Sequence, residues 1–139
     1  MRERTLIIVK PDGVERGLAD QILERFSDKG FTIVQRKELT IPMSLAERHY
    51  AEHRDKPFYP SLVRYITSGP VVVAVLEKEN AIADARALMG ATDPAKATPG
   101  TIRGDYGESI DRNTIHGSDS SESAQREIQL FFEENSDES

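Results

Sequence analysis

Apolar residues follow two kinds of pattern along the chain. Continuous apolar runs at residues 6–9 and 71–76 are typical of strands buried in a sheet. Elsewhere apolar residues recur three or four positions apart, as at Ile22 and Phe26, which is the spacing of one helix face. The chain is therefore expected to mix strands and helices throughout its length.

Taken together, these patterns predict the element order β-α-β-α-α-β-α-loop-β-α. We expect strands at residues 6–9, 31–41, 71–76 and 113–118, and helices at residues 18–29, 44–54, 61–67, 80–89 and 120–132. Two βαβ-like halves indicate an α+β fold, a ferredoxin-like βαββαβ sandwich with helices packed on a four-stranded antiparallel sheet. Residues 91–113 show no clear periodicity, and a loop of this length in a compact domain is usually functional or disordered.

Length and charge limit the classes of protein that fit. A chain of 139 residues fits a single domain, which we expect over residues 1–132, followed by a short acidic tail over residues 133–139. The net charge is −6, and four acidic residues lie in the tail. This charge disfavours a general binder of nucleic acid or of anionic membranes, which is usually basic. It leaves room for a small cationic pocket.

Three further features exclude other classes. The chain has no cysteine, so disulfide frameworks, zinc ribbons and thiol chemistry are excluded. The longest apolar run, residues 71–76, is far shorter than a membrane-spanning helix requires. The N-terminal residues do not follow the pattern of a secretory signal. We expect a cytoplasmic protein without a membrane partner.

The most informative segment surrounds His116. This histidine lies at the end of a short predicted strand and is followed by Gly117 and Ser118, and Glu127 lies eleven residues further on in the last predicted helix. A carboxylate on one imidazole nitrogen fixes the tautomer and leaves the other nitrogen as a nucleophile. A partly buried histidine satisfied by Ser118 or by a backbone carbonyl explains the same pattern.

A second candidate group surrounds the long loop. Arg86 precedes the loop, Thr92 opens it and Arg103 lies within it. Two guanidinium groups and a hydroxyl suit a phosphate clamp, because guanidinium donors match phosphate oxygens in pairs. Solvated surface arginines are the alternative interpretation.

Two other functions remain open from the residues alone. His49, Glu52 and His53 match the inverted zinc-protease motif H-x-x-E-H, which predicts a zinc hydrolase. A ferredoxin-like fold also occurs in RNA-binding modules, although the chain lacks the aromatic strand motif of that class and is acidic.

Four blocks of the chain resemble the nucleoside diphosphate kinase family. Residues 113–119, Asn-Thr-Ile-His-Gly-Ser-Asp, resemble the family's signature. Residues 5–14 resemble its first strand and turn, residues 99–105 the core of its loop, and residues 122–128 its last helix. The blocks occur in the family's order along most of the chain.

The resemblance implies a ping-pong phosphotransferase. His116 would attack the γ-phosphate of a nucleoside triphosphate, usually ATP, through Nδ1 and pass the phosphoryl group to a nucleoside diphosphate. Mg²⁺ would bridge the phosphate oxygens with few or no direct protein ligands. Nucleoside tri- and diphosphates would be the ligands, and the chain would form a homo-oligomer built from dimers, a tetramer or a hexamer, with a tetramer favoured.

The resemblance also implies roles for particular residues. Tyr50 would bond the phosphohistidine, and Phe58 and Ile110 would hold the base from two sides without selecting one base. Lys10 and Asn113 would contact the ribose. The implied catalytic residues are His116, Glu127, Ser118, Tyr50 and Lys10, and the implied nucleotide-binding residues are Lys10, His53, Phe58, Arg86, Thr92, Arg103, Ile110 and Asn113.

Overall fold

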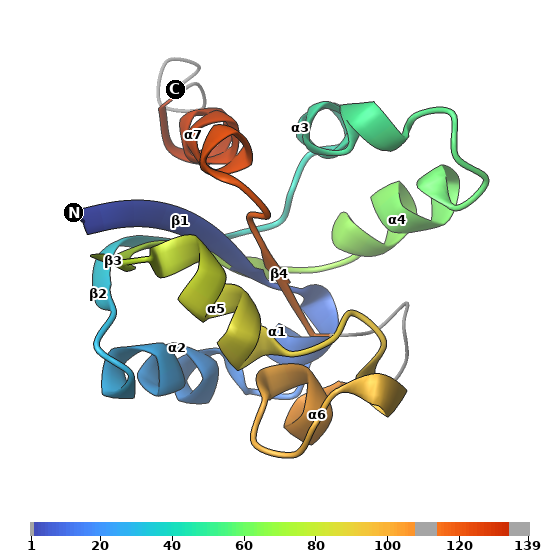
Figure 1. The fold of residues 1–139 in the computed structure, drawn as a ribbon. Helices are drawn as coiled ribbons and strands as arrows, with labels where there is room; N and C mark the ends of the chain where they lie inside the picture. Colours follow the sequence, from blue (N-terminus) through green and yellow to red (C-terminus); the bar gives the residue numbers. More distant parts are fainter. Residues whose placement is uncertain (1, 108–113, 134–139) are drawn as a thin grey trace.

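A four-stranded antiparallel sheet forms the centre of the molecule in a computed structural model, which describes residues 2–107 and 114–133 (Figure 1). Its strands are β1 (Arg2–Val9), β2 (Thr32–Leu39), β3 (Val71–Glu79) and β4 (Ile115–Gly117), in the spatial order β2-β3-β1-β4. β1 pairs with β3 along its whole length and with β4 at its end, where Ile8 lies opposite His116. The predicted α+β fold and antiparallel sheet are confirmed.

Helices cover both faces of this sheet. They are α1 (Pro11–Glu15), α2 (Ala19–Asp28), α3 (Met43–His49), α4 (Tyr59–Ile66), α5 (Ala81–Met89), α6 (Ile102–Tyr106) and α7 (Ser121–Ile128), with 3-10 turns at Ala51–His53 and Pro94–Lys96 and a π turn at Gln129–Glu133. Helices α2 and α5 lie on one side of the sheet, and α3, α4 and α7 lie on the other (Figure 1). None of the helices in the described ranges is long and apolar enough to cross a membrane.

Residues 6–9 of β1 and 71–76 of β3 are apolar because both faces of these two central strands are buried there, each in a separate core. On one face Ile7 and Val9 pack with Phe26 of α2 and Met89 of α5. On the other face Leu6 and Ile8 pack with residues of α3, α4 and the segment after α7. Strands buried on both sides lose the alternating pattern that marks a half-exposed strand. The two cores hold α5, α7 and α3 around the end of β1 and β4, where the site lies.

Several element boundaries differ from the sequence-based expectation. The helix expected at residues 44–54 ends at His49, and a separate 3-10 turn follows at Ala51–His53. Ser44 does not cap it, because Met43 already begins α3 and no side chain caps its first turn. Asn80 stands at the start of α5 without capping it; instead Glu3 of β1 accepts a hydrogen bond of 2.9 Å from the Ile82 N–H.

The segment expected as one long loop contains two short elements. Pro94–Lys96 forms a 3-10 turn and Ile102–Tyr106 forms α6. Thr101 caps α6 by accepting a hydrogen bond of 3.0 Å from the Gly104 N–H. A five-residue helix is too short to show a helical period in the sequence. The predicted strand at residues 113–118 is present as β4, but Asn113 itself and residues 134–139 of the predicted tail lie outside the described residues.

Candidate active site

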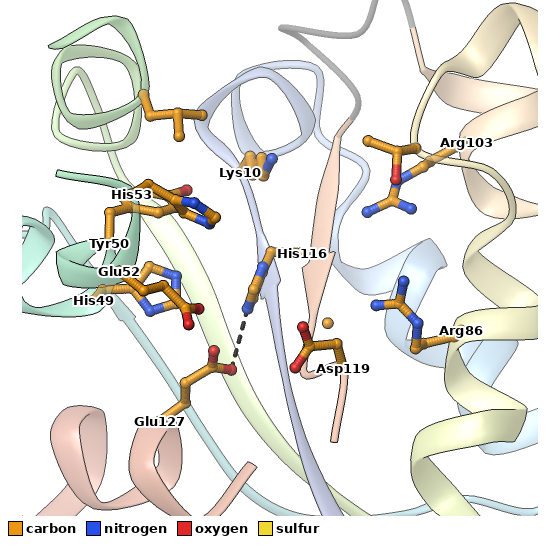
Figure 2. A pocket seen from close by; sticks show the side chains of 13 residues that line it. Lys10, His49, Tyr50, Glu52, His53, Arg86, Arg103, His116, Asp119 and Glu127 are labelled. Atoms are coloured by element: carbon orange, nitrogen blue, oxygen red, sulfur yellow. Dashed lines mark hydrogen bonds and ion pairs between the residues drawn. The ribbon is translucent and has the colours of Figure 1, made fainter. Parts of the chain in front are cut away.

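Side chains from nearly every part of the fold meet in one pocket beside β4 (Figure 2). His116 stands on β4, Glu127 on α7, and Arg86 and Arg103 on α5 and α6. The pocket is lined by Lys10, His49, Tyr50, Glu52, His53, Leu62, Arg86, Thr92, Arg103, His116, Gly117, Asp119 and Glu127. The site therefore joins residues that are far apart in the sequence. The most distant pair is Lys10 and Glu127, which are 117 positions apart.

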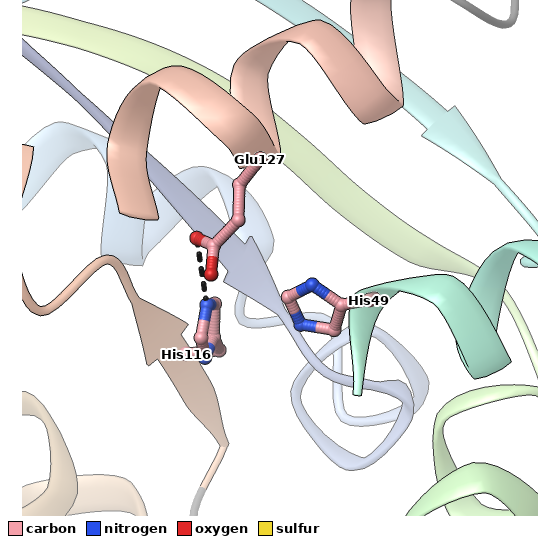
Figure 3. A group of neighbouring side chains, drawn as sticks. All are labelled: His49, His116 and Glu127. Atoms are coloured by element: carbon pink, nitrogen blue, oxygen red, sulfur yellow. Dashed lines mark hydrogen bonds and ion pairs between the residues drawn. The ribbon is translucent and has the colours of Figure 1, made fainter. Parts of the chain in front are cut away.

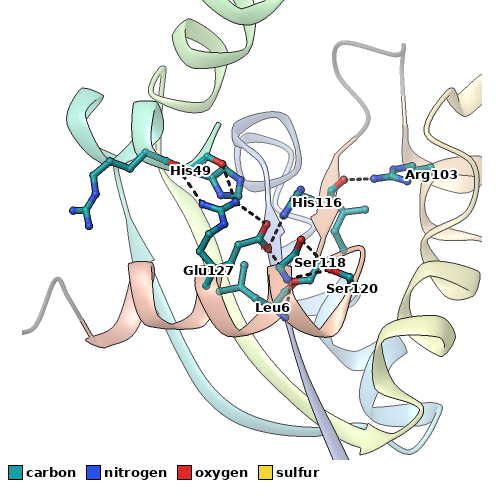
Figure 4. A network of polar contacts seen from close by, with 11 residues as sticks. Leu6, His49, Arg103, His116, Ser118, Ser120 and Glu127 are labelled. Atoms are coloured by element: carbon teal, nitrogen blue, oxygen red, sulfur yellow. Dashed lines mark hydrogen bonds and ion pairs between the residues drawn. The ribbon is translucent and has the colours of Figure 1, made fainter. Parts of the chain in front are cut away.

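Glu127 orients the His116 ring. His116 Nε2 lies 3.1 Å from Glu127 Oε1, and Ser118 donates a hydrogen bond of 2.7 Å to the same oxygen (Figure 4). A carboxylate only accepts, so the shared proton is on Nε2. In the neutral ring, Nδ1 then carries the lone pair. His116 is thus held as a potential nucleophile through Nδ1.

The Glu127 carboxylate is buried and ionised. Burial alone raises the pKa of this group, but the hydrogen bond and charge of His116, together with His49 and Ser118, lower the pKa of Glu127 to about 2. Ser120 caps the start of α7, accepting a hydrogen bond of 3.1 Å from Ser123 N–H, and the helix then carries Glu127 on the same buried stripe as Ala124. A charge on a buried helix stripe is unusual unless it is paired.

We predict that Ser118→Ala modestly slows the phosphoryl transfer that the family resemblance implies. The substitution removes one of the hydrogen bonds on Glu127 while leaving its contact with His116, a loss of about 1 kcal/mol or about fivefold in rate. The measurement is kcat in a coupled nucleotide assay.

Ser120→Ala is the matched control for this substitution. It removes the cap of α7 and lowers the melting temperature, but it touches neither His116 nor Glu127. Equal loss of kcat in both variants would show that helix stability, not the Glu127 contact, sets the rate.

His49 packs directly against the nucleophile candidate. Its ring meets His116 edge to face, with 4.8 Å between the ring centroids, and only 3% of the residue is exposed. Burial, followed by the charge of His116, lowers the pKa of His49 to about 3, so the ring is neutral. Arg126 of α7 donates to the carbonyls of Arg48 and His49 at 3.3 and 3.4 Å, which ties α7 to the end of α3 (Figure 4).

A row of aromatic rings leads from His49 to the mouth of the pocket. Centroids are 4.6 Å apart between His49 and Tyr50, 6.3 Å between Tyr50 and His53, and 5.7 Å between His53 and Phe58. Burial and then the charge of Glu127 raise the pKa of Tyr50, so its hydroxyl stays a donor. Phe58 is 48% exposed, so its ring is accessible to a ligand.

The opposite wall is cationic. Arg103 is buried and donates to the carbonyls of Gly90 and Ile115 at 2.9 and 2.8 Å. Burial, and then the charge of Arg86, lowers the pKa of Arg103 to about 10, which still leaves it charged at neutral pH. Lys10 is also buried, at the end of β1. Cations that converge on one pocket attract an anionic ligand strongly.

The start of β4 is strained and held by buried hydrogen bonds. Thr114 has φ +77°, an uncommon conformation for a β-branched residue. Its hydroxyl donates to Asp12 at 2.9 Å, its carbonyl accepts from the Lys10 N–H at 2.8 Å, and Tyr65 donates to Asp12. The network fixes the entry of β4 against the turn that carries Lys10.

The structure brings together most of the predicted site residues. The pocket lining includes Lys10, Tyr50, His53, Arg86, Thr92, Arg103, His116 and Glu127. Ser118 donates a hydrogen bond to Glu127, and the Phe58 ring lies beside that of His53 at a tilt. Ile110 and Asn113 lie outside the described residues. The sequence did not indicate that His49 packs on His116, or that Asp119 lines the pocket. Asp119 could have been found from its position two residues after Gly117, because the residues that follow a strand ending at a site often line that site.

The predicted H-x-x-E-H zinc site does not form. That motif needs both histidines on one continuous helix, but α3 ends at His49 and His53 lies in a separate 3-10 turn. His49 is buried whereas Glu52 is exposed. Nothing in the described fold or in the comparisons below supports a zinc hydrolase.

An oriented histidine facing a cationic wall defines an enzyme that transfers an anionic group. The profile of the family described as "Nucleoside diphosphate kinase" matches residues 3–136. The chain belongs to the nucleoside diphosphate kinase family and is a phosphotransferase that acts on nucleotides.

Individual relatives agree with this assignment. The chain is 61% identical over 130 residues to a nucleoside diphosphate kinase of Thermus thermophilus, an alignment that covers 94% of this chain and 95% of the relative. The nucleoside diphosphate kinase of Aquifex aeolicus superposes with a TM-score of 0.93 at 45% identity, covering 97% and 98% of the two chains. That of Halobacterium salinarum, solved in complex with CDP, superposes with a TM-score of 0.93 at 51% identity, covering 97% and 90%.

Proposed function

We propose that the chain transfers the γ-phosphoryl group of a nucleoside triphosphate, usually ATP, to a nucleoside diphosphate by way of a phosphohistidine on His116. The observation that carries this proposal is the 3.1 Å contact between His116 Nε2 and the ionised Glu127, since it directs the Nδ1 lone pair away from the carboxylate. In the first half-reaction, Nδ1 forms a bond to the γ-phosphorus while the bond to the β,γ-bridging oxygen breaks, and the diphosphate leaves.

Glu127 acts through the imidazole in both half-reactions. When Nδ1 takes the phosphoryl group, the ring gains positive charge, and the buried carboxylate 3.1 Å from Nε2 stabilises it. In the second half-reaction a terminal oxygen of the acceptor diphosphate attacks phosphorus, the N–P bond breaks, and the ring returns to its starting state. One phosphate clamp serves donor and acceptor in turn.

The cationic wall holds the phosphates. Phosphoryl transfer depends mainly on positioning and on neutralising charge, and Arg86, Arg103 and Lys10 supply both. Thr92 and His53 complete the clamp, and Tyr50 donates its hydroxyl to the phosphohistidine. In this proposal Lys10 and Asn113 are assigned to the ribose, and Phe58 and Ile110 are assigned to the base. The exposed ring of Phe58 supports stacking, which accepts any base.

Mg²⁺ fits this site as an ion carried by the nucleotide. The pocket residues proposed to hold the phosphates include Lys10, Arg86, Arg103 and Thr92, which are cationic or hydroxyl groups, whereas Mg²⁺ prefers oxygen anions and water. Phosphate oxygens and water would therefore hold it, with few or no direct protein ligands. When bound, it neutralises charge on the phosphates.

We propose a cytoplasmic location, which the lack of cysteine supports. We further propose a homo-oligomer built from dimers, a tetramer or a hexamer, for which light scattering gives the mass directly.

Initial-rate kinetics test the ping-pong scheme. With ATP varied at several fixed concentrations of a diphosphate such as GDP, we expect parallel double-reciprocal lines, because the two nucleotides never share the site. GDP, CDP and UDP should all serve as acceptors. Intersecting lines would contradict the phosphohistidine scheme.

A further inference from the structure

Two histidines and a glutamate meet at the floor of the pocket. His49 from α3, His116 from β4 and Glu127 from α7 each offer one ligand atom, and these atoms all lie within 4.8 Å of one another (Figure 3). The three residues also line the open pocket, so an ion can reach them from solvent. Among the described residues, these three form the one group of histidine and acidic side chains that lie close enough together to hold a metal ion.

His49 provides an independent indication of a ligand. Both of its ring nitrogens are buried, and neither has a hydrogen-bond partner. A buried polar atom without a partner destabilises the fold, so an unpaired imidazole beside a second histidine and a carboxylate calls for an explanation. The lone pair of a neutral imidazole is a good ligand for transition metals.

We propose that His49, His116 and Glu127 bind Zn²⁺ and that the bound ion inhibits phosphoryl transfer. The two nitrogens and one oxygen suit Zn²⁺, which takes three protein ligands and a water in open sites, and they do not suit Mg²⁺, which prefers oxygen. The inhibitory half of the proposal rests on the function proposed above for His116, whereas the binding half does not.

The geometry is close to that of a zinc site. Ligand atoms of a tetrahedral zinc ion lie about 3.4 Å apart, given bonds of about 2.0–2.2 Å. His116 Nε2 and Glu127 Oε1 are already 3.1 Å apart. His49 completes the site by a small shift of its side chain. The hydrogen bonds of Arg126 to the end of α3 keep His49 facing Glu127.

Zinc at this position removes the nucleophile by changing the tautomer. In the metal-free ring the proton is on Nε2 and the lone pair is on Nδ1. When the ion takes the Nε2 lone pair, the neutral ring must carry its proton on Nδ1, which then cannot attack phosphorus. Because Glu127 then binds the ion, it no longer accepts a hydrogen bond from Nε2.

Direct zinc binding tests the first half. The nucleotide-free protein competes with a chromophoric chelator for Zn²⁺, with the excess Mg²⁺ of an assay present throughout. We expect one ion per chain in the wild type and affinity at least about tenfold weaker in His49→Phe, because even outer partners of zinc ligands contribute about 10–100-fold. Phenylalanine keeps a buried ring at this position.

Two further variants make this test specific. The chain has three histidines, so His53→Gln removes one histidine as His49→Phe does, but leaves the cluster intact and should bind zinc like the wild type. Glu127→Gln should weaken binding as His49→Phe does, which covers the case in which His49→Phe fails to fold. No zinc on the wild type, or equal binding by all variants, would overturn the proposal.

Activity in a buffer that fixes free Zn²⁺ tests the second half. Each rate is compared with that of the same variant without zinc. We expect reversible inhibition of the wild type, relieved by EDTA, and at least about a tenfold higher inhibitory concentration for His49→Phe. Stoichiometric zinc with an unchanged rate would overturn the inhibitory half. If His116 takes no phosphate in zinc-free protein, the proposed function fails. The zinc-binding measurements then still show whether His49, His116 and Glu127 form a zinc site.

Discussion

Replacing His116 by alanine should reduce phosphoryl transfer by about 10⁴-fold or more, because the substitution removes the atom that carries the phosphoryl group. Described residues around the pocket offer no second histidine placed as His116 is: His49 is buried with a neutral ring, and His53 lies nearer the mouth, beside Phe58. The measurement is kcat/KM with ATP and GDP, together with retention of labelled phosphate on the protein.

The fold should tolerate this substitution. The His116 side chain is 23% exposed, and Glu127 keeps its 2.7 Å hydrogen bond from Ser118 when the imidazole is gone. We therefore expect a melting temperature near that of the wild type, which separates lost chemistry from lost structure. A folded His116→Ala protein that still transfers phosphate at a substantial rate would rule out His116 as the nucleophile.

Replacing Arg103 by alanine should lower kcat/KM by about 10²–10³-fold, the usual effect of removing one preorganised charged donor from a transition state. Arg103 is placed for two tasks at once. Its guanidinium lines the pocket, and it also donates to the carbonyls of Gly90 and of Ile115, the residue before His116. The first task supplies charge to the phosphates, and the second fixes α6 and β4 around it.

Arg16→Ala is a matched control that separates these tasks. Arg16 also donates to a backbone carbonyl of α6, that of Tyr106, at 2.5 Å, but it does not line the pocket. We expect the Arg16 variant to retain nearly the wild-type kcat/KM. If both variants lose activity equally, the ordering of the loop segment rather than the charge of Arg103 accounts for the effect.

The sheet and most helices were predictable because their signals are local. Residues 6–9 and 71–76 are apolar at every position, which only a strand buried on both faces requires, and the structure places them in β1 and β3. The segment from Asn113 to Asp119 combines a strand end, a histidine, a glycine and a hydroxyl. This combination indicates a functional site from the sequence alone. The contact between His116 and Glu127 agrees with that interpretation.

Other features were not predictable because they depend on distant contacts or on very short elements. Helix α6 spans five residues and has no period to detect. The hydrogen bond from Ile82 to Glu3 at the start of α5 joins residues far apart in the chain, so the sequence around α5 does not indicate it. The role of His49 was obscured because its motif suggested a helix shared with His53, whereas the fold turns it toward His116.

The central claim, that His116 carries the phosphoryl group on Nδ1, is tested most directly by locating the phosphate on the protein. The zinc-free enzyme is incubated with ATP and Mg²⁺, digested without acid because a phosphoramidate is acid-labile, and sequenced by tandem mass spectrometry. We expect one phosphoryl group on His116, assigned to Nδ1 by phosphorus–nitrogen NMR coupling and lost on addition of GDP with formation of GTP. Phosphate on another residue, on Nε2, or not discharged by GDP would contradict the account.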